Sequence, residues 1–280
     1  MTILITGARG KVGQAIINRL HSAGLPVRAA SATPAELTVP AGVEVAELGL
    51  DRPDTFETAL HGIGQVFLYP EPAGIDAFIK TAQAAGVAHL VLLSSSSVLS
   101  PDAESDPLAG HSLKVEQALA ASGLTCTFLR PDAFASNALG WAYFIGQNLP
   151  IQLAYPDADI APIHPDDIAD IAVEALTGTA LTGRAITLTG AHALTFREQL
   201  AVLSDVLDRD IPVEQITHAE AEQQMGRYMP APMVGSLLAL WRAASAGPAT
   251  IADTTETLLG TPARTFTQWA RENAAAFTPR

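Results

Sequence analysis

The sequence predicts an α/β fold: a doubly wound parallel sheet with a smaller C-terminal α/β lobe. Short apolar runs alternate with helical segments through the first half of the chain, which is the pattern of parallel strands joined by helical crossovers. Three helical segments also have clear ends, because Gly24, Gly86 and Gly123 stand where a C′ residue favours the left-handed conformation. After Pro131 this alternation decays, so the second half is expected to pack differently.

Six apolar runs of the first half are predicted to be strands. They are Thr2–Thr6, Val27–Ala30, Val43–Glu47, Gln65–Tyr69, His89–Ser94 and Thr125–Arg130. Helices are expected after the first strand, through Ala15 to Gly24, and then at about Pro53–Leu60, Gly74–Ala85 and Leu108–Ala121. Right-handed crossovers would place a ligand crevice at the carboxyl ends of these strands.

The second half is expected to be mainly helical. The segments Ala133–Asn148, Pro165–Leu176, Phe196–Leu207 and Thr265–Phe277 are predicted to be helices, and Ala185–Thr189 a strand. Thr195 and Glu198 have the spacing of a capping box. Between about 210 and 265 we expect helices broken by prolines.

The turn Thr6–Gly13 is the strongest functional signal in the chain. A strand feeding a glycine-rich turn and a helix N-terminus is typical of a site that binds a pyrophosphate. Gly7 permits the tight turn, Gly10 lets the backbone approach phosphates, and Gly13 lets the helix pack closely on the strand. The spacing is GxxGxxG. The alternative is a surface turn that is merely rich in glycine.

Composition and charge exclude several classes of protein. The net charge is −13 and no basic cluster occurs, so nothing favours binding to nucleic acid. The longest apolar stretches, such as Leu90–Leu93 and Val234–Leu240, are too short to span a bilayer. A strand that begins at residue 2 leaves no room for a signal peptide. We therefore expect a cytoplasmic monomer or homodimer.

Metal and hydrolase chemistry receive no support from the sequence. Cys126 is the only cysteine and lies in an apolar run, so it is expected to be a core thiol. The histidines are scattered without the spacing of metal ligands. No G-x-S-x-G segment occurs, which argues against a serine hydrolase.

Five segments together resemble the NmrA-like group of atypical short-chain dehydrogenases/reductases. They are Thr6–Gly13, Ser94–Ser97, Leu124–Pro131 with Phe134 and Asn137 after it, Pro162–Ala169, and Leu259–Phe277. The resemblance implies a nicotinamide cofactor held by a Rossmann-like domain at 1–131, completed by segments from about 151–190. It also implies that most of 132–280 is a substrate-binding lobe.

The second strand indicates which nicotinamide cofactor is used. An NAD site normally has Asp or Glu at the end of this strand, where the chain has Ala30, Ser31 and Ala32. A 2′-phosphate requires a cation and hydroxyl donors. The resemblance implies that Arg9 supplies the cation, and Ser31 and Thr33 add hydroxyl groups. We therefore expect NADP(H) rather than NAD(H), although relatives often have a basic residue near Ala32 and this chain does not.

Residues of the turn and of the strand ends are expected to contact the cofactor. They are Thr6, Gly7, Arg9, Gly10, Lys11, Val12, Gly13, Ser31, Leu50, Tyr69, Pro70, Ser94 and Pro131. Relatives often have Asp-Leu after the third strand, and Gly49 replaces that Asp. Alternatively, Tyr69 is an aromatic residue of the core.

The usual Tyr-x-x-x-Lys pair of the superfamily is missing. The corresponding helix has His111 and Lys114 one turn apart on one face. A histidine can serve as a general acid near neutral pH, but the spacing of three does not let the tyrosine role pass directly to His111. Ser94 and Ser95 are the other catalytic candidates, at the end of a central strand. Alternatively, His111 and Lys114 are solvated residues of the helix, and Ser94 and Ser95 belong to an ordinary turn at the end of the strand.

The predicted reaction is hydride transfer from a nicotinamide cofactor to a quinone, ketone or similar conjugated carbonyl compound. The nicotinamide itself carries this chemistry. Ser96, Phe134 and Trp141 are expected to contact an apolar or aromatic substrate, unless the aromatics are core residues. The main alternative is a redox sensor without catalysis that binds NAD(P) and a protein partner. A nucleotide-sugar epimerase is less favoured, because such enzymes normally keep the Tyr and Lys.

Overall fold

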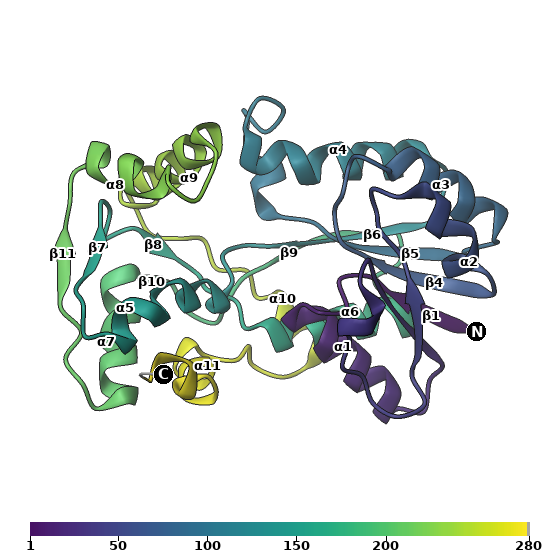
Figure 1. Ribbon diagram of the computed structural model, residues 1–280, viewed down its shortest axis with the longest axis horizontal. Coiled ribbons are helices and arrows are strands. Elements are labelled where there is room, and N and C mark those ends of the chain that lie inside the picture. Colours follow the sequence, from purple (N-terminus) through teal and green to yellow (C-terminus); the bar gives the residue numbers. More distant parts are fainter. Residues whose placement is uncertain (279–280) are drawn as a thin grey trace. The chain divides into compact units, whose positions relative to one another are not determined.

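The structure is a computed structural model that describes residues 1–278 (Figure 1). The chain divides into two compact units. The first unit contains residues 1–105, 109–131 and 165–187, and the second contains the rest of the described chain.

A seven-stranded sheet forms the centre of the first unit, with strand order β3-β2-β1-β4-β5-β6-β9. Its strands are β1 (Thr2–Ile5), β2 (Val27–Ser31), β3 (Glu44–Glu47), β4 (Ile63–Leu68), β5 (His89–Leu93), β6 (Cys126–Pro131) and β9 (Ala185–Leu188). The pairs from β3 to β6 are parallel. The hydrogen bonds from Phe128 N to Arg184 O and from Asp132 N to Leu188 O advance in the same direction, so β9 is parallel as well. This confirms the predicted doubly wound α/β fold.

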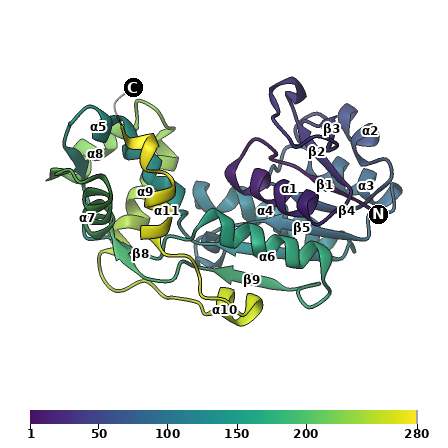
Figure 2. The same cartoon turned by 90° about the horizontal axis from the view of Figure 1, so that it is seen from below.

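Helices cover both faces of this sheet (Figures 1 and 2). They are α1 (Lys11–Ser22), α2 (Phe56–Leu60), α3 (Ile75–Ala84), α4 (Pro107–Ala121) and α6 (Pro165–Thr177). α1 and α6 pack together on one face, where Arg19 Nε donates to Asp170 Oδ1 at 2.5 Å. On the other face, α2, α3 and α4 bury Phe56, Phe78 and Leu119 against alternate residues of the strands. The sheet is thus apolar on both faces, as a parallel sheet requires.

The second unit consists of short elements. They are α5 (Ala142–Gly146), β7 (Ile151–Leu153), β8 (Asp159–Ile160), β10 (Leu194–Thr195), α7 (Phe196–Leu207), β11 (Val213–Gln215), α8 (His218–Met225), α9 (Ala231–Ala244), α10 (Thr254–Leu259) and α11 (Phe266–Glu272). β10 pairs antiparallel with β8, and β11 pairs parallel with β7. The predicted capping box is confirmed: Thr195 Oγ1 accepts from Glu198 N, and Glu198 Oε2 accepts from Thr195 N.

Aromatic side chains fill the core of the second unit. Phe266 stacks on Trp269 with ring centres 5.4 Å apart, and Phe277 meets Trp269 edge to face at 6.2 Å. Leu203 of α7 is fully buried in the same cluster. A smaller cluster around Val234 and Leu238 holds α9.

Three predicted helices are wrong in extent. The first is Pro53–Leu60, where Pro53–Thr55 is a 3₁₀ helix and α2 begins only at Phe56. The segment Ala133–Asn148 is a 3₁₀ helix at Ala135–Trp141 followed by the short α5, and Gly140 lies within the 3₁₀ part. Glycine lowers the stability of an α-helix by about 1 kcal/mol relative to alanine. The segment Thr265–Phe277 is divided at Asn273, after which Ala274–Phe277 is a 3₁₀ helix. Among the described residues, no helix is both long enough and apolar enough to cross a membrane.

Candidate active site

Two glycines of the turn between β1 and α1 have no room for a side chain. Gly7 has φ +62°, and a Cβ on it would lie 2.3 Å from Cδ2 of Tyr69. A Cβ on Gly13 would lie 2.4 Å from the carbonyl oxygen of Gly7. Such separations are far below van der Waals contact, so both positions require glycine. The turn therefore has the open backbone that the approach of a pyrophosphate requires.

Thr6 fixes this turn against the neighbouring strand. Its Oγ1 donates to the carbonyl oxygen of Phe67 at 3.1 Å and accepts from the backbone N–H of Tyr69 at 2.8 Å. Both bonds are made at the carboxyl end of β4. Thr6 is itself buried, so the hydroxyl aligns the ends of β1 and β4 at the point where the strand order reverses.

A cavity of about 480 Å³ opens at the carboxyl ends of β1 to β4. Its lining includes eight of the residues predicted to contact the cofactor: Thr6, Gly7, Arg9, Gly10, Ser31, Leu50, Tyr69 and Pro70. The remaining lining residues are Ala8, Ala30, Ala32, Leu48, Gly49, Asp51 and Glu71. This is the position where a doubly wound sheet binds its ligand.

Tyr69 lies in the wall of this cavity. Its ring meets Phe67 edge to face with centres 6.1 Å apart, and its hydroxyl lies 3.1 Å from where a Cβ of Gly10 would be. Burial raises the pKa of Tyr69, so its hydroxyl keeps its proton at neutral pH. Within residues 1–278 this hydroxyl makes no hydrogen bond. It is therefore a free donor beside the glycine turn.

The other predicted cofactor residues do not line this cavity. Lys11, Val12 and Gly13 form the first turn of α1, where Lys11 is exposed and the other two are buried. Pro131 ends β6 and is buried. Ser94 follows β5, and its backbone N–H donates to Leu129 O at 2.7 Å.

The serines after β5 have different surroundings. Ser94 is only 6% exposed, and its Oγ is buried without a hydrogen-bond partner among the described residues. The hydroxyl of Ser95 accepts from Ser97 N at 3.2 Å and lies 2.8 Å from Ser97 Oγ. It thereby caps the 3₁₀ helix Ser96–Leu99. Ser94 thus has a buried hydroxyl without a partner, whereas Ser95 has a local structural role.

His111 is tied to the edge of the cavity. Its Nε2 lies 2.9 Å from the carbonyl oxygen of Pro70, which can only accept, so Nε2 carries a proton and donates it. In the neutral ring, Nδ1 is then an acceptor. Lys114, one turn further along α4, is exposed and has no partner in the described part of the chain.

Glu116, next along α4, is buried rather than solvated. Its carboxylate accepts two hydrogen bonds from Arg130 of β6, at 3.0 Å from Nε and 2.6 Å from Nη2. Hydrogen bonding to Glu116 raises the pKa of Arg130. The pair joins α4 to the sheet and leaves neither group free for chemistry.

The residues predicted to contact the substrate belong to different units. Ser96 is half-buried in the first unit. Phe134 forms a bridge to Ile163 in the second unit, and Trp141 packs edge to face on Phe196 at 5.9 Å. Trp141 thus takes part in the core of its unit.

Three charged residues near the cavity were missed from the sequence. Asp51 lines it and approaches the position that a Cβ of Gly49 would occupy, at 3.1 Å. Glu36 forms an ion pair with Arg9. Arg52 donates to the carbonyl oxygen of Ala32 at 3.2 Å. All three come from loops after β2 and β3, so the rule that ligands meet the carboxyl ends of strands would have indicated them.

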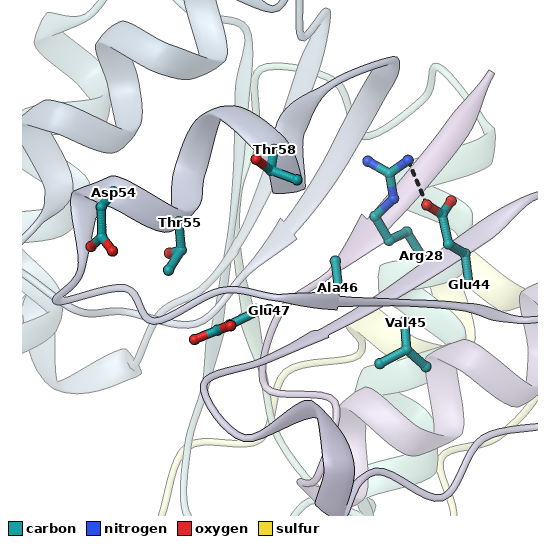
Figure 3. A pocket seen from close by; sticks show the side chains of 8 residues that line it. All are labelled: Arg28, Glu44, Val45, Ala46, Glu47, Asp54, Thr55 and Thr58. Carbon is teal, nitrogen blue, oxygen red and sulfur yellow. Dashed lines mark ion pairs between the residues drawn. The ribbon is translucent and has the colours of Figure 1, made fainter.

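A second cavity, of about 420 Å³, lies at the sheet edge between β3 and α2 (Figure 3). It is polar, and at one side of it Arg28 Nη2 of β2 pairs with Glu44 Oε1 of the neighbouring strand β3 at 2.9 Å. It contains no glycine turn, and its strand residues run along β3 instead of gathering at the carboxyl ends. The first cavity is therefore the better cofactor site.

The first cavity fits a dinucleotide. The turn exposes backbone at positions where a Cβ would collide with Tyr69 or Gly7, and Arg9 and Ser31 supply a cation and a hydroxyl in the lining. Comparison with known proteins agrees. Residues 7–179 match the family model described as NAD(P)H-binding.

Related proteins cover nearly the whole chain. A (4-alkanoyl-5-oxo-2,5-dihydrofuran-3-yl)methyl phosphate reductase of Streptomyces griseus is 40% identical over 99% of this chain and 99% of its own. An NAD(P)H azoreductase of Xenophilus azovorans is 33% identical over 98% and 99%. In fold, a solved nucleoside-diphosphate-sugar epimerase from Staphylococcus aureus has a TM-score of 0.82 at 18% identity, covering 97% of this chain and 100% of its own. The chain therefore belongs to the NAD(P)H-binding family and is an NAD(P)H-dependent oxidoreductase.

Proposed function

We propose that the chain uses NADPH to reduce a conjugated carbonyl compound, such as a quinone or a conjugated ketone. The observation that carries this proposal is that a serine hydroxyl, and no tyrosine, is available as a hydrogen-bond donor near the carboxyl end of β5. Ser94 has a buried hydroxyl without a partner, and α4 has no tyrosine that could act as the usual acid. The site therefore favours a substrate that needs a hydrogen-bond donor more than a strong acid.

A conjugated acceptor meets this requirement. When bound, the reduced nicotinamide supplies a hydride. The electron pair displaced in the substrate is delocalised onto an oxygen, and a proton from water completes the reduction. The Ser94 hydroxyl donates to that oxygen, which also relieves the cost of about 1–3 kcal/mol that an unsatisfied buried hydroxyl carries.

His111 has a positioning role in this scheme. Its Nε2 proton is engaged by Pro70 O, so the neutral ring has no second proton to give. The bond instead holds the segment after β4, which lines the cavity. Lys114 remains available to a ribose hydroxyl.

The two relatives support the substrate class. The first is named for a 5-oxo-2,5-dihydrofuran, in which a ring double bond is conjugated with carbonyl groups. The second is named as an azoreductase, and an azo group is likewise a conjugated acceptor. Both names indicate substrates with a reducible π bond, and the first also contains the carbonyl oxygens that the proposed role of Ser94 requires.

The second unit is proposed to supply the substrate-binding surface. Phe134 and Trp141 are half-buried there, and they offer aromatic area to an apolar molecule. NADPH is proposed over NADH because the end of β2 lacks an acid and Arg9 lines the cavity.

The test is NADPH oxidation with matched acceptors. We expect turnover with quinones and conjugated enones or lactones, and little with saturated ketones of the same size. Ser94→Ala should lower kcat about 100-fold or more, as loss of one donor to a developing oxyanion does, with an unchanged Kd for NADPH. Ser97→Ala, a serine on the same turn, is the control and should keep kcat within about twofold.

Two results would contradict the proposal. If the protein binds the cofactor but none of the acceptors supports NADPH oxidation, the result would favour the sensor alternative. A protein that also distinguished oxidised from reduced cofactor would favour it further. Full activity of Ser94→Ala would remove Ser94 from the mechanism.

A further inference from the structure

An arginine from the loop after β3 reaches the end of β2. Arg52 Nη2 donates to the carbonyl oxygen of Ala32 at 3.2 Å, and the backbone N–H of Arg52 donates to Gly49 O at 2.8 Å. Ala32 and Gly49 both line the cofactor cavity. A Cβ on Gly49 would lie only 2.6 Å from Nε of Arg52, so this glycine gives the arginine its room. A cation thus stands beside Ala32, where the sequence alone showed none.

Arg9 and Arg52 each have a carboxylate partner. Arg9 pairs with Glu36, with 56% and 60% of the two side chains exposed. Arg52 Nη1 pairs with Glu47 Oε1 at 2.9 Å, with 41% and 53% exposed. Exposed pairs of this kind are worth about 0–1 kcal/mol. Either arginine can therefore exchange its carboxylate for a more highly charged anion.

Glu36 is held close to the end of β2. Its Oε2 accepts from Thr33 Oγ1 at 3.0 Å as well as pairing with Arg9. Glu47 belongs to β3 and lines the other cavity, where Figure 3 shows its carboxylate. The end of β2 thus brings together two arginines, the hydroxyls of Ser31 and Thr33, and one anchored carboxylate.

We propose that Arg52 is a specificity-determining residue that binds the 2′-phosphate of NADPH together with Arg9, and that Glu36 opposes this binding. The inference rests on the proposed use of NADPH. A phosphate dianion gains charge-assisted hydrogen bonds from both guanidinium groups. Glu36 repels it and competes for Arg9, while favouring a free 2′-hydroxyl, to which a carboxylate is the usual partner. Selectivity for NADPH is then the balance of these two cations against Glu36 and the other nearby carboxylates. Those carboxylates are Glu47 beside Arg52, and Asp51 and Glu71 in the lining.

Equilibrium titration followed by cofactor fluorescence tests this balance without any substrate. Arg52→Gln should weaken NADPH binding about tenfold, as loss of a hydrogen bond to a charged group implies, and change NADH binding less than about twofold. Glu36→Gln should act in the opposite direction, strengthening NADPH binding about threefold or more and leaving NADH unchanged or weaker. The effect of Arg52→Gln should shrink as salt rises from low to high concentration.

The second unit offers a matched control. Arg197 pairs with Asp157 through Nε at 3.2 Å, and 50% of its side chain is exposed. Arg197→Gln also removes one exposed cation and one ion pair, so it should leave both dissociation constants unchanged. Circular dichroism and Tm of each variant report folding.

The outcomes separate this inference from the proposed function. If the wild type prefers NADPH but Arg52→Gln changes neither constant, or weakens both equally, the role of Arg52 is wrong and the proposed function stands. Weaker NADPH binding by Glu36→Gln would overturn the opposing role of Glu36. A wild type that prefers NADH would overturn the use of NADPH, and this inference with it.

Discussion

The two units of the chain are stabilised mainly by different interactions. In the first unit, strands of four to six residues pair in one continuous parallel sheet. In the second, the strands have two or three residues and form two separate pairs. The first unit therefore has long runs of backbone hydrogen bonds, whereas the second depends on the packing of buried side chains.

This difference has a functional consequence. The cavity of the first unit is built from strand ends and from a turn whose shape is set by glycines. Such a site tolerates little change in its backbone. In the second unit, aromatic residues such as Trp269 and Phe266 hold short helices together, and surfaces built on them can vary while the core is kept. This difference suits the proposed division of labour, in which the first unit binds the cofactor and the second binds the substrate.

The largest expected loss of stability in the first unit is at the buried pair of Glu116 and Arg130. Glu116→Ala leaves the guanidinium of Arg130, whose side chain is 20% exposed, without its partner, so the free energy of unfolding should fall by about 3 kcal/mol, the low end of the range for a buried ion pair. Urea unfolding followed by circular dichroism measures this.

Two further variants sharpen that result. Replacing both Glu116 and Arg130 by leucine should restore much of the lost stability, because an apolar pair needs no desolvation. Glu57→Ala, at an exposed position of α2, should change the free energy of unfolding by less than about 0.5 kcal/mol. A small effect of Glu116→Ala would show that Arg130 finds water or another partner.

The same contrast explains what could be predicted from sequence. Strands of the first unit were located within about two residues, because buried parallel strands are continuous apolar runs bounded by turn residues. The helix ends at Gly24, Gly86 and Gly123 are confirmed by φ values of +72°, +75° and +78°. Short strands such as β8 and β10 were missed, since two residues have no periodicity to detect.

The site was predictable only in part, for a related reason. The glycine turn is local in sequence, so its spacing revealed it. Glu36 and Arg52 act from loops, and their approach to Arg9 and Ala32 depends on the sheet order that places β2 between β1 and β3. The burial of Glu116 likewise could not be deduced, because its partner Arg130 lies on the sheet and not on the same helix.

A core substitution in the second unit tests whether the units differ in function. Leu203→Ala should lower the free energy of unfolding by about 3 kcal/mol, as expected for a fully buried leucine. Because every lining residue of the cofactor cavity comes from the first unit, the Kd for NADPH should stay within about twofold under native conditions. A large loss of NADPH affinity would mean that the cofactor site depends on the second unit.

A smaller effect is expected at the N-terminus of α7. Thr195→Ala removes the hydroxyl that accepts from Glu198 N, which should cost about 1 kcal/mol. Thr195→Ser keeps the cap and should cost much less. If the two variants are equally unstable, packing of the threonine methyl group and not the capping hydrogen bond stabilises this helix end.

The subtlest prediction concerns pH and returns to the first unit. Thr127 Oγ1 donates to Leu181 O at 2.8 Å, so it accepts from Nε2 of His89, also at 2.8 Å. Burial lowers the pKa of His89, so His89 binds a proton more readily in the unfolded chain than in the folded one. The stability that neutral His89 contributes is therefore present above the ordinary histidine pKa near 6.5 and is lost as the pH falls below it.

Unfolding in urea between pH 7.5 and 5.5 measures the effect. His89→Gln keeps a donor toward Thr127 but does not titrate, so it should lower stability at neutral pH and flatten its decline toward acid. His61→Gln, at an exposed histidine, is the control and should keep the slope of the wild type. An unchanged slope in His89→Gln would mean that the acid sensitivity arises elsewhere, and that the buried sheet of the first unit accommodates a protonated His89 without loss of stability.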